Sequence, residues 1–195
     1  MLNNKNEGIK IFILSGPAGA GKTTLLNLLF RKNFIKKKFI RGISYTTRKS
    51  RPNEKNGKDY FFVSKREFLK LKKQKFFLET QKVLDNYYGT PKYFYDEAKQ
   101  SKKNLILCID VKGGMYLKKR LKRDKIITIF ISAPDKNELF NRLEKRTEKT
   151  FFIKKRLSLA NKELKYSRYY DYLVINKKIN VALDEIMSII LKEMN

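Results

Sequence analysis

Eight consecutive residues near the N-terminus have the types and spacing that could hold a phosphate chain. They are Gly16, Pro17, Ala18, Gly19, Ala20, Gly21, Lys22 and Thr23, which fit the pattern G-x-x-x-x-G-K-[ST] in full. Glycines let the backbone wrap closely around phosphate oxygens, and a following helix adds positive potential at its N-terminus. Lys22 would reach the β- and γ-phosphates, and the Thr23 hydroxyl would bind Mg²⁺. The alternative is a glycine-rich turn without a ligand, but the full pattern rarely arises by chance, and the strand before it and the helix after it make chance rarer still. We therefore expect a site for a nucleoside triphosphate.

A second group of chemically suggestive residues follows between residues 44 and 63. Arg48 and Arg51 lie three positions apart and are surrounded by serine, threonine and tyrosine hydroxyls. An arginine side chain can bond two phosphate oxygens at once through its planar guanidinium. Taken alone, the group fits either a pocket for a phosphate dianion or a surface loop with incidental arginines.

The elements around the glycine-rich segment predict an α/β core. Apolar runs that read as buried strands are Ile9–Ser15, Leu105–Ile109, Ile126–Ile131 and, more weakly, Leu173–Ile175. Residues 22–31 and 181–194 have the apolar spacing of amphipathic helices. Strands that alternate with helices indicate a parallel sheet flanked by helices on both faces.

Between residues 41 and 98 the pattern changes to that of a smaller insert. Residues 44–47, 60–63 and 77–83 read as strands of an antiparallel sheet, joined by turn residues.

Three helix starts can be read from capping residues. Ser64 with Glu67 forms a capping box, and Asp135 with Glu138 gives a similar start. Thr90 before Pro91 suggests a third, because proline suits the first turn of a helix.

The whole chain resembles the guanylate kinase family. The stretches that match are GPAGAGKTT, SYTTRKSRPNEKNGKDYFFVS, FLET followed by DNYYGTPK, LCID, the pair RLEKR and KKRL, and LVIN. They occur in the family's order, from Ile9 to the last helix. The resemblance implies one domain over residues 1–195. Within it, the P-loop core would take residues 9–40, 99–140 and 166–195, a GMP-binding lobe 41–98, and a short lid 141–165.

The resemblance also implies roles for individual residues. The GMP phosphate would contact Ser44, Arg48, Arg51, Tyr60 and Tyr88. Guanine recognition would fall on Glu79 and Thr90, with Asp110 nearby at a strand end where it could also hold Mg²⁺ through water. On the ATP side, the residues implied are the whole segment from Gly16 to Thr23, then Thr24, and Asn176 near the adenine. Arg142, Arg146 and Arg156 match the family's lid and ATP-side arginines, and the catalytic set would be Lys22, Arg48, Arg146 and Arg156.

The chemistry of these residues agrees with transfer of a phosphoryl group from ATP to GMP. A carboxylate at Glu79 can accept from guanine N1–H and the 2-amino group, a donor pair that adenine lacks. The acceptor phosphate is already an anion, so no general base is needed, and the absence of histidine from the chain is harmless. We expect GDP and ADP as products, dGMP as a second substrate, and a place in purine nucleotide metabolism.

Three positions depart from the family pattern. Cys108 stands where the family usually has a carboxylate, and Lys177 replaces a common Asp after Asn176. The lid between Arg146 and Arg156 is about one residue short and lacks a glycine. Weaker GMP binding and altered closure are the expected consequences.

Charge leaves other function classes open. The chain has 46 Lys and Arg against 19 Asp and Glu, a net charge of +27. A polyanionic partner and a compositional bias toward lysine both explain this excess. A basic nucleic-acid-binding P-loop protein, a non-catalytic guanylate-kinase-like binding module and a kinase for another small phosphate acceptor are therefore the alternatives, nucleic acid being the less favoured partner. Without an apolar leader or a membrane span, we expect a cytoplasmic protein; the oligomeric state stays open.

Overall fold

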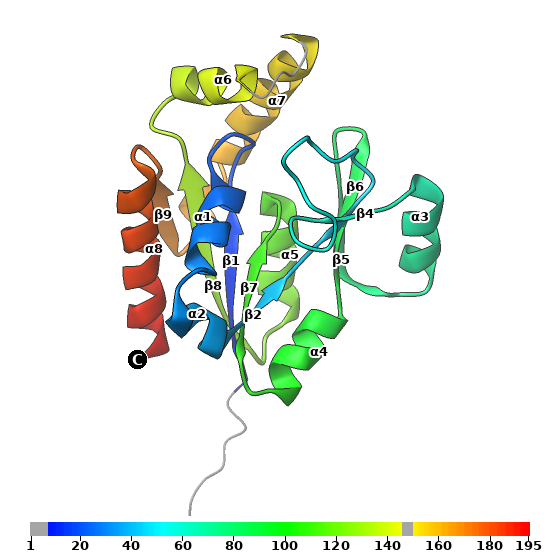
Figure 1. Cartoon of the computed structure of the whole chain (residues 1–195), viewed down its shortest axis with the longest axis vertical. Helices are drawn as coiled ribbons and strands as arrows, with labels where there is room; N and C mark the ends of the chain where they lie inside the picture. The colour runs from blue at the N-terminus through cyan, green and yellow to red at the C-terminus, as the bar shows by residue number, and fades with distance from the viewer. Residues whose placement is uncertain (1–7, 146–149) are drawn as a thin grey trace, which may run out of the picture.

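A computed structural model describes residues 8–145 and 150–195 of the chain. Its core is a five-stranded parallel sheet with the order β2-β7-β1-β8-β9. The strands are β1 (Lys10–Ser15), β2 (Phe39–Gly42), β7 (Asn104–Cys108), β8 (Lys125–Ser132) and β9 (Tyr172–Ile175). Figure 1 shows helices on both faces of this sheet, which confirms the predicted α/β class.

Alternate side chains of β1 build the two halves of the core. Phe12 and Leu14 pack with α1 (Lys22–Leu29), α2 (Asn33–Lys38) and α8 (Ile179–Met194). Ile11 and Ile13 pack on the other face with α4 (Tyr93–Gln100) and α5 (Val111–Arg120). Because both faces of a parallel strand are covered, β1 reads as a continuous apolar run rather than an alternating one.

The inserted lobe is a second sheet of four strands, ordered β4-β3-β6-β5. Its strands are β3 (Tyr45–Thr46), β4 (Phe61–Phe62), β5 (Phe77–Val83) and β6 (Asn86–Pro91), and α3 (Lys65–Lys73) packs beside β5. The predicted antiparallel sheet is wrong in one pairing. β6 pairs antiparallel with β3 and β5, but β3 and β4 run parallel, because residues 47–60 cross over between them instead of making a hairpin.

Two of the three predicted helix starts are confirmed. The Ser64 side chain accepts a hydrogen bond from the Glu67 amide, and Asp135 accepts one from the Glu138 amide. The start at Thr90 is wrong: Thr90 and Pro91 end β6, and Lys92 holds the position before α4. The Thr90 side chain bonds across the sheet to Glu79 rather than to a helix.

The core extends further along the chain than the predicted lobe boundary. Arg41 and Gly42 pair with β7 as part of the core sheet. α4, at the other end of the insert, packs on β2 and β7.

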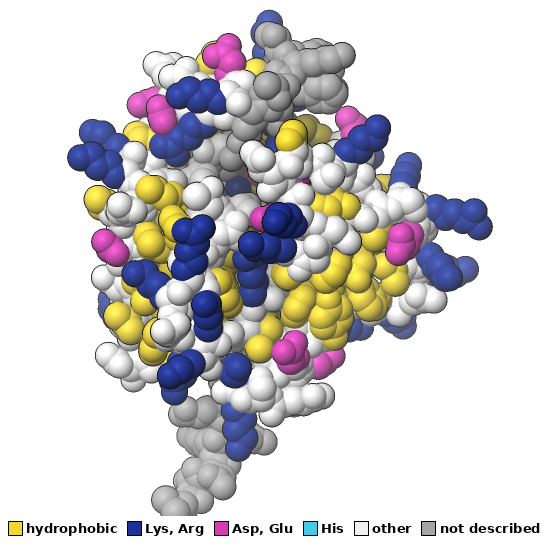
Figure 2. All heavy atoms as spheres, in the orientation of Figure 1, with side chains coloured by type: hydrophobic (Ala, Val, Ile, Leu, Met, Phe, Trp, Pro, Cys, Tyr) yellow, Lys and Arg dark blue, Asp and Glu magenta, His cyan; other side chains and the backbone are white. Residues whose placement is uncertain are grey.

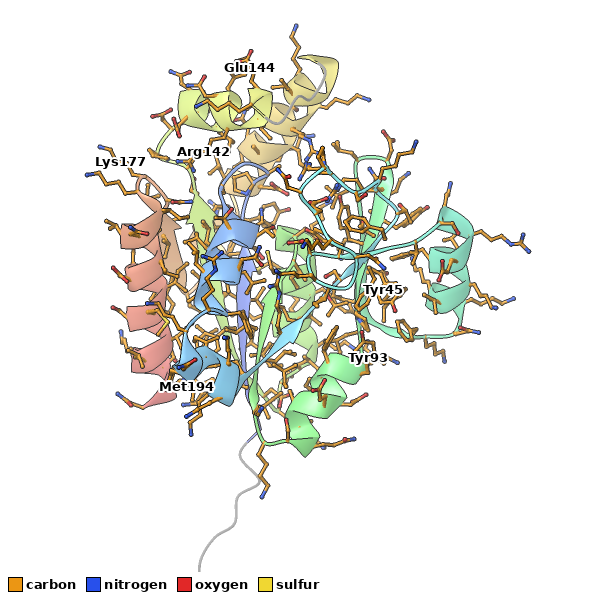
Figure 3. The ribbon with its side chains drawn as sticks, viewed as in Figure 1. Tyr45, Tyr93, Arg142, Glu144, Lys177 and Met194 are labelled. Carbon is orange, nitrogen blue, oxygen red and sulfur yellow. The ribbon has the colours of Figure 1, made fainter. Side chains whose placement is uncertain are left out.

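Aromatic rings join the lobe to α4. Tyr45 stacks on Phe61 with 4.7 Å between ring centroids, and Phe76 lies 6.0 Å from Tyr93. Figure 3 labels Tyr45 and Tyr93 at this junction, and Figure 2 shows an apolar patch on the same part of the surface. This packing seats the lobe against the core.

Two helices lie over the carboxyl ends of the core strands, α6 (Lys136–Glu144) and α7 (Thr150–Leu164) (Figure 1). A short 3₁₀ turn, η1 (Ser167–Tyr169), then leads into β9. Arg146 of the predicted catalytic set lies outside the described residues. In the described part of the chain, every helix is too short or too polar to cross a bilayer.

Candidate active site

A single cleft contains residues of the glycine-rich segment, the lobe and α7. Its lining includes, from the predicted site, Gly16, Ala18, Gly19, Gly21, Lys22, Thr23, Ser44, Arg48, Arg51, Tyr60, Glu79, Tyr88, Asp110 and Arg156. These residues span 141 positions of sequence, counted from 16 to 156 inclusive. The fold thus brings the two candidate phosphate sites to opposite walls of one space.

The glycine-rich segment forms a loop between β1 and α1. Gly16 and Gly21 have φ values of +139° and +91°, a region that residues with a side chain rarely adopt. The Lys22 ammonium lies over the loop and donates to the carbonyls of Gly16 and Pro17, at 2.5 and 2.9 Å. The loop is therefore formed and its cation is already positioned over it.

Asn176 supports this loop from behind. Its side-chain amide is buried and donates to the Ala20 carbonyl at 2.9 Å. A Cβ at Gly21 would lie 2.3 Å from the same amide nitrogen. Asn176 is not among the residues that line the cleft, and neither are Pro17, Ala20, Thr24 and Thr90. In this structure Asn176 braces the P-loop, and the adenine contact implied by the resemblance stays a prediction.

Glu54 holds the two arginines of the lobe. It accepts from the Arg48 guanidinium at 2.8 Å and from the Arg51 amide at 2.8 Å, and the Arg51 guanidinium lies 3.7 Å away. Burial would raise the pKa of Glu54, but these hydrogen bonds and charges outweigh it and lower the pKa. Arg48 also donates to the Lys49 carbonyl at 2.7 Å. Glu54 and the Lys49 carbonyl thus hold the Arg48 guanidinium in place, and the Arg51 guanidinium lies beside the same carboxylate.

Tyr60 and Tyr88 form an aromatic side of the cleft, next to Arg48. Their ring centroids are 6.0 Å apart, and the Arg48 guanidinium lies 5.4 Å from the Tyr60 ring. Burial raises the pKa of the Tyr60 hydroxyl far above its usual range, so it remains a donor at physiological pH. Ser44 is buried beside them and shares a 3.2 Å hydrogen bond with Thr90.

Glu79 is a buried carboxyl group with one unused oxygen. Its Oε1 accepts from the Thr90 hydroxyl at 2.9 Å and the Thr90 amide at 3.2 Å, while Oε2 has no hydrogen-bond partner among the described residues. Burial, and then the nearby Asp110, raise the pKa of Glu79 to about 8. A buried polar atom without a partner is costly, so Glu79 Oε2 is a candidate contact for a ligand.

Asp110 lies opposite Glu79 and begins α5. Its Oδ1 accepts from the amides of Lys112 and Gly113 at 2.8 and 3.2 Å. Burial raises its pKa, although these two hydrogen bonds oppose the change. Asp110 is therefore both the cap at the end of its strand and a residue of the cleft. Its other oxygen, Oδ2, lies on the side of Glu79, since a Cβ built on Gly113 would contact both carboxyl groups.

The helices above the cleft contribute Arg156 and Glu163. Both residues belong to α7 and line the cleft. Burial raises the pKa of Glu163 to about 7, opposed by Lys22 and Arg156 nearby. Arg142 does not line the cleft. It bonds Glu138 at 2.7 Å and the Asn176 carbonyl at 2.9 Å, close to the turn where Figure 3 shows Lys177.

Sequence reasoning missed Glu54 and Glu163. Glu54 falls within the matching block that contains Arg48 and Arg51, and its spacing of six and three residues from them was an available signal. Nothing in the sequence around Glu163 distinguishes it from other charged residues of an amphipathic helix. Cys108 also lines the cleft, where burial raises the pKa of its thiol and keeps it neutral.

Comparison with known proteins agrees with this geometry. A family model described as guanylate kinase matches residues 8–193. A guanylate kinase from Wolbachia sp. subsp. Brugia malayi (strain TRS) is 43% identical over 190 residues, 97% of this chain and 95% of the relative. One from Aster yellows witches'-broom phytoplasma is 40% identical over 94% of this chain and 86% of the relative. The crystal structure of guanylate kinase from Anaplasma phagocytophilum superposes with a TM-score of 0.75 at 30% identity, covering 95% of this chain and 86% of that one. This chain belongs to the guanylate kinase family.

Proposed function

We propose that this protein transfers the γ-phosphoryl group of ATP to the phosphate of GMP, and that dGMP is a second acceptor. The observation that carries the proposal is the single cleft in which Lys22 and the P-loop face Arg48 and Arg51 of the lobe. Two anionic groups that repel each other in water can be held end to end between two such cationic sites.

Glu79 would select guanine. Its unpaired Oε2 and its Thr90-bonded Oε1 lie at the lobe side of the cleft, where a base with two adjacent donors would satisfy them. Adenine presents no such donor pair and would leave a buried acceptor unmatched, a loss of about 1–3 kcal/mol or more. Thr90 is fully buried and donates to Glu79, so here it acts mainly by orienting the carboxyl group.

Charge neutralisation would provide most of the catalysis. The transferred group carries negative charge on its equatorial oxygens. Lys22, Arg48 and Arg156 line the cleft, where they would surround the two phosphates. α7 covers the cleft and limits the access of water to the reacting phosphate. Arg146 is proposed for the same role from the resemblance alone.

The residues present fit a magnesium ion that arrives with ATP. Thr23 and Asp110 both line the cleft and offer oxygen ligands, which Mg²⁺ prefers. The described residues contain no group of three or more acidic, cysteine or histidine side chains that could hold a metal alone. The phosphates of ATP would therefore complete the coordination, and the ion would supply further positive charge.

The alternatives have less support from the site. A non-catalytic binding module needs no P-loop, yet Lys22 and Thr23 are present and point into the cleft. A nucleic-acid-binding surface should gather its basic residues in a stripe. Figure 2 shows Lys and Arg scattered over the visible face and interrupted by neutral and apolar atoms.

The test is a coupled assay of purified protein with Mg-ATP and a panel of nucleoside monophosphates. We expect GDP from GMP, dGDP from dGMP, little turnover of AMP, and almost none in the Lys22→Ala variant. Equal turnover of AMP and GMP would refute the role of Glu79. ATP hydrolysis stimulated by DNA, with no monophosphate required, would favour the nucleic-acid alternative.

A further inference from the structure

Arg41 is a half-buried cation at the point where the chain leaves the core for the lobe. It is the third residue of β2, pairs with Ile106 of β7, and precedes the lobe's Ser44 by three residues. Its guanidinium carbon lies 5.9 Å from the Phe30 ring centroid. Burial lowers the pKa of Arg41, and Asp59, Cys108 and Tyr60 act against that change. A charged guanidinium partly removed from solvent usually has a structural or functional role.

Two contacts connect Arg41 to the lobe by way of the P-loop helix. The Arg41 Nη1 donates to Asn27 Oδ1 at 2.7 Å, and Asn27 Nδ2 lies 3.5 Å from Asp59 Oδ1. Asn27 is in α1, four residues after Thr23 and so on the same face of the helix. Asp59 directly precedes Tyr60 in the lobe. The contacts therefore cross from the ATP side of the molecule to the GMP side.

Asp59 is an integral part of the loop that carries Tyr60. Its Oδ2 accepts from the Lys55 amide at 2.9 Å, and the Gly57 amide donates to the Tyr60 carbonyl at 2.9 Å. Asp59 and Tyr60 are neighbours in this loop, so a shift of Asp59 would move the Tyr60 ring, whose centroid lies 5.4 Å from the Arg48 guanidinium carbon.

Because Cys108 is not a carboxylate, Asp59 is the acidic residue that stabilises the charge of Arg41. Cys108 follows Ile106 by two residues on the neighbouring strand, where the family pattern usually has an acidic residue. Here the thiol is neutral because burial raises its pKa. Among the described residues, Asp59 is the carboxylate that raises the pKa of Arg41, and its effect is larger than those of Cys108 and Tyr60.

We propose that Arg41 is a positioning residue for GMP: through Asn27 it holds the Asp59–Tyr60 loop against the P-loop helix and so fixes the acceptor phosphate site. Arg41 itself does not line the cleft and acts only through these neighbours. The inference rests on the assignment of the lobe to GMP under Proposed function.

The first test replaces Arg41 by methionine, which keeps the packing on Phe30 and removes the donor. We expect the KM for GMP to rise about tenfold, the range of one hydrogen bond from a charged group, with the KM for ATP within about twofold. Arg41→Lys, which keeps the charge and one donor, should restore part of the loss. The matched control is Arg31→Met, an exposed arginine just after α1, which should leave both KM values unchanged.

The second test is a double-mutant cycle with Asn27→Ala. If Arg41 acts through Asn27, the Arg41→Met, Asn27→Ala pair should raise the KM for GMP no more than the larger single change does. Additive effects would overturn the proposal. So would equal changes in the KM for ATP and GMP accompanied by a lower melting temperature in Arg41→Met, since these indicate a structural role. If the unaltered protein fails to phosphorylate GMP, the functional assignment fails; if it succeeds and Arg41→Met matches it, only this proposal fails.

Discussion

The P-loop and the lobe, the two proposed phosphate sites, are built by different means. The P-loop uses main-chain geometry: glycines with positive φ at Gly16 and Gly21, and Asn176 bracing a backbone carbonyl from behind. The lobe uses side chains, with Arg48 and Arg51 held by Glu54, and Tyr60 placed under Arg48. A backbone site is specified by a few consecutive residues, whereas a side-chain site needs a supporting residue for each member.

This difference predicts how each site should fail. A substitution in the P-loop should exclude the nucleotide sterically, so the loss of activity should be nearly complete. A substitution in the lobe should cause a partial loss of GMP binding, because the other supporting side chains stay in place. Four substitutions separate the two kinds of failure.

Gly21→Ala should have the largest effect. The new Cβ would lie 2.3 Å from the Asn176 amide nitrogen, in a backbone conformation with φ of +91°. We expect kcat/KM for ATP to fall by about a hundredfold or more, in the range of a lost catalytic contact. Steady-state kinetics at saturating GMP measures this. Asn176→Ala in the same background makes room for the methyl group but also removes the hydrogen bond to the Ala20 carbonyl. Activity of the double variant equal to that of Asn176→Ala alone would show that the contact, rather than φ, dominates.

Arg48→Lys should have a smaller, one-sided effect. Lysine keeps the charge but cannot bond Glu54 and the Lys49 carbonyl as a planar fork does. We expect the KM for GMP to rise about tenfold to thirtyfold, with the KM for ATP little changed. An equal rise in both constants would contradict the separation of the two sites.

Glu54→Gln should weaken GMP binding less than Arg48→Lys. The amide retains a hydrogen-bond acceptor for Arg48 but loses the charge that helps to hold both arginines. A rise of about threefold to fivefold in the KM for GMP is expected from a charged hydrogen bond made neutral. Glu138→Gln is the control, since Glu138 holds Arg142 outside the cleft. No difference between the two variants would remove Glu54 from the site.

Glu79→Gln should change the pH dependence of the protein's stability as well as its selectivity for guanine. The pKa of Glu79 is about 8 in the folded protein against an ordinary 4.5, so the unfolded chain loses this proton first as pH rises. Protonated Glu79 therefore stabilises the fold at low pH, and its contribution to the free energy of unfolding is lost as pH rises from about 4.5 to 8. Glutamine does not titrate, so the variant should melt higher than the parent at pH 8 or above, by about 2–4 °C per kcal/mol relieved. At pH 5 the gap should be smaller, and a gap independent of pH would contradict the raised pKa.

The contrast also explains what could be predicted from the sequence. The P-loop was identified because its eight residues are contiguous and its strand and helix flank it directly. The lobe residues became interpretable only through the family resemblance, since Ser44, Glu79 and Tyr88 come from separate segments that meet through strand pairing.

The errors have physical causes. Pro91 suggested a helix start, but Thr90 is needed to bond Glu79, so the strand continues through both residues. β2 escaped prediction because it is four residues long and contains Arg41 and Gly42, which do not read as a buried strand. The parallel pairing of β3 and β4 depends on the conformation of residues 47–60, which local propensity does not specify.

The raised pKa of Glu79, caused by burial and by Asp110, links its protonation to the proposed binding of GMP. Below about pH 8 the free carboxyl group is mostly protonated, yet guanine presents donors and is best received by the ionised form. Binding of GMP should then release a proton to the solvent. Calorimetric heats of GMP binding would consequently vary with the ionisation enthalpy of the buffer, while those of ATP, at the far wall of the cleft, would carry no such contribution from Glu79.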